Sequence, residues 1–119
     1  MKTKLIQPKE SEIQKSIIEY LRLKGWYVQR LNSGMAHIKT GLDKSRWIRL
    51  SEAGTPDILA FHACGCCVNE SAVDLYFIEV KRPGKNPTPI QIAKMEELKA
   101  YGSKCLVVHS LTELQQEGL

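Results

Sequence analysis

A carboxylate and a lysine end one face of a strand that is otherwise apolar. In the segment 74–81, DLYFIEVK, alternate residues share a face, and both faces are apolar for most of the length. One face ends in Glu79 and Lys81. An E-x-K pattern on a solvated strand needs no function, because an exposed Glu–Lys pair contributes little. The pair therefore needs further evidence before it predicts a chemical site.

That evidence is a second carboxylate, which the apolar pattern brings opposite the first. The segment 56–61, PDILAF, forms an antiparallel hairpin with the later strand if Leu59 lies opposite Phe77. A slip of one residue would turn the apolar side chains to the wrong faces. In this register Asp57 lies opposite Glu79. Two carboxylates about 5 Å apart repel by about 3 kcal/mol at an effective dielectric of about 20, so a site that offsets this repulsion is the better interpretation.

The grouping has the chemistry of a divalent metal site. Hard cations such as Mg²⁺ take oxygen ligands, which Asp57, Glu79 and a nearby main-chain carbonyl can supply. Such an ion polarises a phosphate oxygen, deprotonates a water and steadies the leaving oxygen. Lys81 would orient or activate the attacking water and stabilise negative charge. The sequence thus predicts phosphate-ester hydrolysis with Mg²⁺ or Mn²⁺.

Helices and strands in the order α-β-β-β-β-α-β-α must position these groups. Ser11 and Gln14 form an S-x-x-Q capping box that predicts the start of the first helix. Thr88 and Gln91 form a second box, with Pro89 at the first helical position. The predicted elements are a helix from 11 to about 25, strands at 26–32, 47–50, 56–61, 74–81 and 104–109, a helix at 88–101 and a terminal helix after Ser110. We therefore expect an α/β fold with a mixed central sheet flanked by helices.

Size and composition limit the classes of protein that this chain can be. With 119 residues, 43% of them hydrophobic and 25% charged, we expect residues 1–119 to form a single globular domain. No apolar run approaches the length of a membrane span, and the start of the chain lacks the apolar core of a signal peptide. We expect a cytoplasmic protein.

Basic residues gather in two places. The formal net charge is +4, and the segment 37–49 has an aromatic residue, Trp47, among its basic side chains. A basic segment with an aromatic suits a nucleic-acid backbone, although a charge run is often only a solvated face. The predicted nucleic-acid contacts are Lys39, Lys44, Arg46, Arg49, Arg82 and Lys85.

Several motifs together resemble a known nuclease family. GTPDIL at 54–59, FIEVKRPG at 77–84 and PIQ at 89–91 resemble the P-D…(D/E)-x-K nuclease pattern. With the leading helix and the N-S-G sequence at 32–34, they resemble more narrowly the virus-type replication-repair nuclease (VRR-NUC) domain. The resemblance extends over nearly the whole chain and implies a restriction-endonuclease-like fold.

The resemblance also implies roles for particular residues. Asp57, Glu79 and the carbonyl of Val80 would bind the metal, and Lys81 would be the catalytic lysine. Glu12 matches an additional acidic residue of the family that binds metal directly or through water. The alternative role of Glu12 is only a favourable interaction with the helix dipole near the N-terminus of the helix.

Gln91 matches a glutamine that follows the lysine in this family. The predicted capping box uses the same side chain, and a single amide is not expected to serve both roles.

The family likewise implies the partners. Members with accessory domains act on branched or flapped DNA in repair, whereas short stand-alone members from phages and bacteria resemble Holliday-junction resolvases and work as homodimers. A chain of this size would therefore be a homodimeric endonuclease that presents two sites to a four-way DNA junction. Flap or general DNA cleavage, and nucleic-acid binding without catalysis, are the alternatives.

A cysteine-bearing segment departs from the family. His62, Cys64, Cys66 and Cys67 form H-x-C-x-C-C, which offers four soft ligands for zinc at an unusual spacing. Reduced cytosolic thiols are the ordinary alternative, and Cys105 is expected to be buried in its strand. A small interaction protein that uses the cysteine segment is a third functional hypothesis.

Overall fold

The computed structural model describes residues 7–31, 35–49, 51–65 and 72–119. Its helices and strands, in chain order, are α1 (Glu10–Leu23), β1 (Tyr27–Arg30), β2 (Met35–Lys39), β3 (Ser45–Arg49), β4 (Ile58–Ala63), β5 (Val73–Val80), α2 (Pro89–Ala100), β6 (Lys104–Val108) and α3 (Leu111–Gln116).

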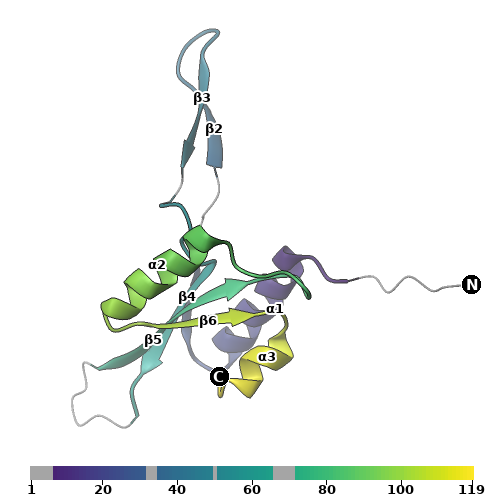
Figure 1. Ribbon diagram of the computed structural model, residues 1–119, viewed down its shortest axis with the longest axis vertical. Coiled ribbons are helices and arrows are strands. Elements are labelled where there is room, and N and C mark those ends of the chain that lie inside the picture. The colour runs from purple at the N-terminus through teal and green to yellow at the C-terminus, as the bar shows by residue number, and fades with distance from the viewer. Residues whose placement is uncertain (1–6, 32–34, 50, 66–71) are drawn as a thin grey trace, which may run out of the picture.

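A four-stranded mixed sheet forms the centre of the fold. Its strand order is β1-β4-β5-β6, with β1–β4 and β4–β5 antiparallel and β5–β6 parallel (Figure 1). The predicted α/β class, with a mixed sheet flanked by helices, is confirmed. The predicted element order lacked one strand: β2 lies in the basic segment where only a strand at 47–50 was expected. Leu50, at the end of that expected strand, lies outside the described residues.

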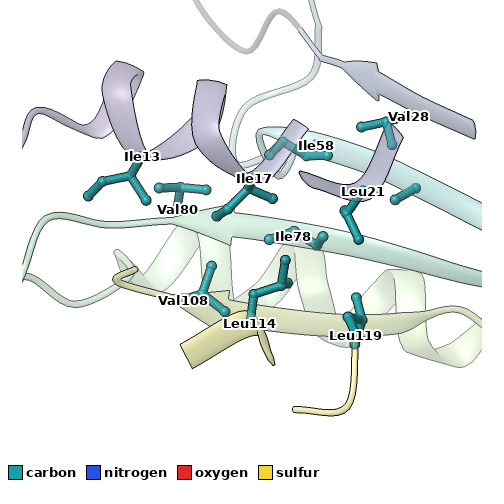
Figure 2. Packing of buried hydrophobic residues seen from close by; sticks show 11 residues of the cluster. Ile13, Ile17, Leu21, Val28, Ile58, Ile78, Val80, Val108, Leu114 and Leu119 are labelled. Carbon is teal, nitrogen blue, oxygen red and sulfur yellow. The ribbon is translucent and has the colours of Figure 1, made fainter. Parts of the chain in front are cut away.

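The main hydrophobic core lies between the sheet and the helices α1 and α3. Alternate residues of each strand face this core, as the period of a strand requires. Figure 2 shows the apolar stripe of α1 packed against side chains of the sheet and of α3. The buried members of the cluster are Ile13, Ile17, Leu21, Val28, Ile58, Ala60, Ile78, Val80, Val108, Leu114 and Leu119. The opposite face of the sheet, which carries Glu79, is the one that meets α2.

The start of α1 corrects a prediction. The helix begins at Glu10 with Lys9 as the N-cap, so Ser11 is already helical and is not the cap. The side chain of Glu12 accepts a hydrogen bond of 3.2 Å from the backbone N–H of Lys9 and thereby satisfies the helix start. Gln14, the other half of the predicted capping box, is buried instead.

The starts of α2 and α3 agree with the sequence. Thr88 Oγ1 accepts from the backbone N–H of Gln91 at 3.3 Å, and Pro89 occupies the first helical position. Ser110 Oγ accepts from the backbone N–H of Glu113 at 3.1 Å, which opens α3. None of the helices in the described ranges has the length and apolar composition needed to cross a bilayer.

Strands β2 and β3 form a separate two-stranded hairpin, here called the arm (residues 35–49). Cross-strand partners are His37 with Trp47 and Lys39 with Ser45. Figure 1 shows the arm projecting away from the body of the molecule. Among the described elements, β2 and β3 make extensive contacts only with each other.

Candidate active site

The predicted hairpin register is the register of the structure. Leu59 pairs with Phe77 across β4 and β5, as the apolar pattern required. The last pair of this ladder is Ile58 with Ile78. Continuing the same register by one residue places Asp57 opposite Glu79. The carbonyl of Asp57 accepts a hydrogen bond of 2.7 Å from the N–H of Leu31, which ties the start of β4 to the end of β1.

Glu79 is a buried carboxylate with only part of its hydrogen-bonding capacity satisfied. Its side chain is 2% exposed. One oxygen, Oε1, accepts a hydrogen bond of 3.1 Å from Gln91 Nε2. The other, Oε2, is buried and has no hydrogen-bond partner among the described residues. An unpartnered buried carboxylate oxygen is costly, so a proton or a cation is needed there.

Burial is the main reason why the pKa of each of the two carboxylates is raised. Burial, followed by the negative charge of Asp57, raises the pKa of Glu79 to about 8, and the Lys81 ammonium acts in the opposite direction. Burial likewise raises the pKa of Asp57, although the Val80 N–H that donates to its Oδ2 at 2.8 Å lowers it. Without a cation, Glu79 therefore holds a proton near neutral pH.

The donor atoms at this position fit a hard divalent cation. Asp57 and Glu79 supply carboxylate oxygens, one of them unpartnered. Because a strand residue directs its own N–H and C=O to the same side, the Val80 carbonyl faces the side on which its N–H meets Asp57. Within the described residues no group of three or more His, Cys, Asp or Glu side chains is placed to hold a metal. Two carboxylates and a carbonyl nevertheless match Mg²⁺, which keeps several waters.

Gln91 serves two roles at once, contrary to the expectation that capping would exclude a role at the site. Its Oε1 accepts a hydrogen bond of 2.9 Å from the Thr88 N–H, and its Nε2 donates to Glu79. An amide has an acceptor and a donor at opposite corners, so both interactions are satisfied together. Gln91 therefore connects the start of α2 to the buried carboxylate.

Lys81 continues the sheet beyond the end of β5. Its backbone N–H donates to the carbonyl of Val108 at 3.0 Å, which extends the parallel pairing with β6 by one residue. Alternation along the strand then places its half-buried side chain on the same face as Glu79. The Lys81 ammonium lowers the pKa of Glu79 against the larger effects that raise it, so the two groups are close enough to interact electrostatically.

The acidic residue of α1 that acts on the pair is Glu10. Its negative charge raises the pKa of both Asp57 and Glu79. Glu12, the residue singled out by the family resemblance, is exposed and caps the helix through the Lys9 N–H. The effect of Glu10 on the site was not predicted from the sequence, because the predicted helix began at residue 11, one residue after it.

The predicted nucleic-acid contacts occupy two separate locations. Lys39, Lys44, Arg46 and Arg49 lie on the arm, and the structure describes the exposed side chains of the first three. Arg82 and Lys85 lie in the connection from β5 to α2, directly after Lys81. That connection is held by His109, whose Nε2 lies 2.8 Å from the Lys85 carbonyl and whose Nδ1 lies 2.9 Å from Glu113 Oε2.

The zinc hypothesis concerns residues that are only partly described. Cys66 and Cys67 lie outside the described residues, so zinc binding stays a prediction. His62 lies 3.5 Å from an Asp74 carboxylate oxygen, and its ring centroid is 4.1 Å from that of Trp26. Cys105 is half-buried in β6 rather than fully buried, and burial raises the pKa of its thiol.

Comparison with known proteins supports the fold independently. A solved structure described as a VRR_NUC domain matches with a TM-score of 0.60 and 21% sequence identity, over 90% of this chain and 90% of that one. No protein-family model matches the sequence, and a search of curated proteins finds no match. The chain therefore has the fold of a VRR-NUC domain, as its motifs indicated.

Proposed function

We propose that this protein is a metal-dependent endonuclease that hydrolyses DNA phosphodiester bonds. The observation that carries the proposal is the pair of opposed carboxylates, half-buried Asp57 and buried Glu79, with an unpartnered Glu79 oxygen and a lysine two residues further along the same face. A protein that needed only stability would gain nothing from this arrangement, because buried like charges are costly. A hard cation explains why both acids occupy the end of the sheet.

Each residue would hold one part of this centre. Asp57 is oriented by the Val80 N–H, and Glu79 by the Gln91 amide. These two carboxylates and the Val80 carbonyl would bind Mg²⁺ or Mn²⁺, which supplies Lewis-acid activation of the phosphate and a more acidic water. Lys81 would orient the attacking water and stabilise negative charge on the phosphate.

Glu10 is the α1 acid proposed to add negative charge to this centre. Its charge already acts on both carboxylates, whereas Glu12 is used at the helix cap. A role for Glu12 in binding the metal, directly or through water, remains part of the family-based proposal. Cleavage by the Glu10→Gln and Glu12→Gln proteins at limiting Mg²⁺ separates the roles of these two acids. Only replacement of the acid that contributes to the site should raise the Mg²⁺ concentration needed for cleavage.

DNA is the proposed partner because basic residues both precede and follow the site residues in the sequence. Arg82 and Lys85 follow Lys81 directly, and the arm carries four more basic residues. Their positive charge suits a phosphate backbone and predicts salt-sensitive binding. Homodimers acting on four-way junctions are proposed from the family resemblance, since two symmetric sites match two symmetric strands.

The testing experiment is cleavage of an end-labelled four-way junction, beside a flap and a linear duplex, with Mg²⁺, Mn²⁺ or chelator. Asp57→Asn and Glu79→Gln keep the shape of each side chain and should abolish cleavage. Glu117→Gln removes an exposed acid at the end of α3 and should cleave like the wild type. Paired symmetric cuts in the junction would support the dimeric resolvase, and cuts in the flap would support repair of flapped DNA.

A nucleic-acid-binding module without catalysis is the alternative, and one observation favours it. The described residues supply two carboxylates close together but no third ligating side chain beside them. Binding without metal-dependent cleavage of any of the three substrates would select this alternative.

A further inference from the structure

The arm leaves a large aromatic side chain exposed at a distance from the sheet. Trp47 is 64% exposed, although it packs against His37 with ring centroids 5.0 Å apart. Leu42, at the tip of the arm, is fully exposed. A two-stranded hairpin on its own is marginally stable in water, and exposed apolar residues do not stabilise it. A binding role explains why the arm keeps these side chains.

The pairing of the strands sorts the arm into two faces. His37, Lys39 and Trp47 lie on one face, because His37 pairs with Trp47 and residues two apart share a face. Arg46 lies on the other, opposite Ile38. Positive charge is therefore present on both faces, and the indole lies on only one of them.

The charge of the arm indicates the chemistry of its partner. Four basic residues and one acid, Asp43, lie between positions 35 and 49, so most of the formal net charge of +4 resides in the arm. Within the described part of the chain, Lys39, Lys44 and Arg46 form no ion pair. Unneutralised cations around an open aromatic ring match a polyanion that also has π faces, which is a nucleic acid.

We propose that Trp47 stacks on an unpaired base and makes the arm selective for nucleic acid with exposed bases over continuous duplex; this inference rests on the proposed function. In an intact duplex the faces of the bases are stacked on one another and are closed to the indole. In a single strand, or at a junction of strands, a base face is open and gains stacking energy on tryptophan. Lys39, on the same face as Trp47, holds the adjacent phosphate, and Lys44 and Arg46 add positive charge that attracts the strand, while the centre at Glu79 acts on it.

A second copy of the chain is a less suitable occupant. The chain carries a net positive charge, and a positively charged arm is repelled by a positively charged partner. The test below nevertheless includes this outcome.

The test measures binding of three labelled DNAs of equal length in chelator, where metal-dependent cleavage is absent. These are a single strand, a fork with unpaired arms and a blunt duplex, measured by fluorescence anisotropy. Trp47→Ala should weaken binding of the strand and the fork about tenfold, equivalent to about 1.4 kcal/mol, and binding of the duplex less than about twofold. Trp47→Phe keeps an aromatic face and should retain most of the affinity.

The matched control is Tyr101→Ala, which removes another exposed aromatic side chain, 86% exposed and outside the arm. It should leave all three affinities unchanged. A Trp26→Phe protein keeps Trp47 as its only tryptophan, so quenching of its emission by the single strand reports stacking directly.

Equal affinities of the Trp47→Ala and wild-type proteins, or equal loss on all three DNAs, would overturn the inference. So would a change of oligomeric state in sedimentation velocity with DNA binding intact, because the arm would then be a protein interface. The outcomes also separate this inference from the proposed function. Binding that depends on Trp47 without any metal-dependent cleavage would refute only the nuclease, whereas cleavage with no dependence of binding on Trp47 would refute only the stacking role.

Discussion

Replacement of Glu79 by glutamine should stabilise the metal-free protein at high pH. The pKa of Glu79 is raised to about 8 from an ordinary value of 4.5, so the folded state binds its proton more tightly than the unfolded state does. Stability therefore falls as pH rises from 4.5 through 8, because folding opposes the ionised form. At about 1.4 kcal/mol per pKa unit the full shift corresponds to about 5 kcal/mol, with burial as its largest cause and the negative charge of Asp57 as the next.

The structure explains why glutamine relieves this cost. Its oxygen can still accept the hydrogen bond of Gln91, and its new amide nitrogen can donate to Asp57 where a second carboxylate stood. We expect the Glu79→Gln protein to match the wild type at about pH 5, where Glu79 is protonated. It should exceed the wild type by about 3 to 5 kcal/mol at about pH 9.

The assay is urea denaturation in chelator at the two pH values, with Glu117→Gln as the control for loss of an exposed acid. A second series adds Mg²⁺ at about pH 8. At a concentration of about 100 times the dissociation constant, the wild type should gain about 2.7 kcal/mol, and Glu79→Gln should gain almost nothing. A Glu79→Gln protein that is less stable than the wild type at about pH 9 would refute the argument, because the buried carboxylate would then be satisfied in the metal-free protein.

Three further predictions concern the surroundings of the site. Lys81→Met keeps the aliphatic stem, so cleavage should be lost while DNA affinity changes less than about threefold; parallel loss of binding and thermal stability would point to misfolding instead. Gly54→Ala should lower the free energy of unfolding by about 3 kcal/mol in urea, because Gly54 has a φ of 83° and a Cβ there would lie 2.6 Å from the Ile90 carbonyl oxygen; an unchanged midpoint would contradict this. Hydrogen bonding to Glu113 raises the pKa of His109 above 6.5. The stabilisation from this pair is therefore present below pH 6.5 and is lost as pH rises through the raised pKa. Glu113→Gln should lower the pKa of His109 measured by NMR titration, and an unchanged pKa would show that the pair is not formed in solution.

The apolar residues were sufficient to predict the register that places Asp57 opposite Glu79. Leu59 and Phe77 lie on one face, and a slip of one residue between the strands would turn apolar side chains to the wrong faces. The start of α2 was equally predictable from the sequence, because the Thr88 cap is an interaction between residues three apart.

Features that depend on distant contacts were not predictable in the same way. Lys9 is an unusual N-cap, so the true start of α1 and the proximity of Glu10 to the site were missed. Among the described elements, strand β2 makes extensive contacts only with β3, so its sequence lacks the burial signal by which core strands are recognised. The double role of Gln91 required the position of the neighbouring strand, which a local motif does not contain.

The contacts of Gln91 give the protein an internal reporter of the state of its buried acid. Its amide orientation is fixed, since only one arrangement both accepts from the Thr88 N–H and donates to Glu79. A change in the ionisation of the acid alters the strength of one hydrogen bond and, through the same rigid amide, the geometry of the other. The hydrogen-exchange rate of the Thr88 amide, at an exposed helix start, thus carries information about a group that solvent does not reach.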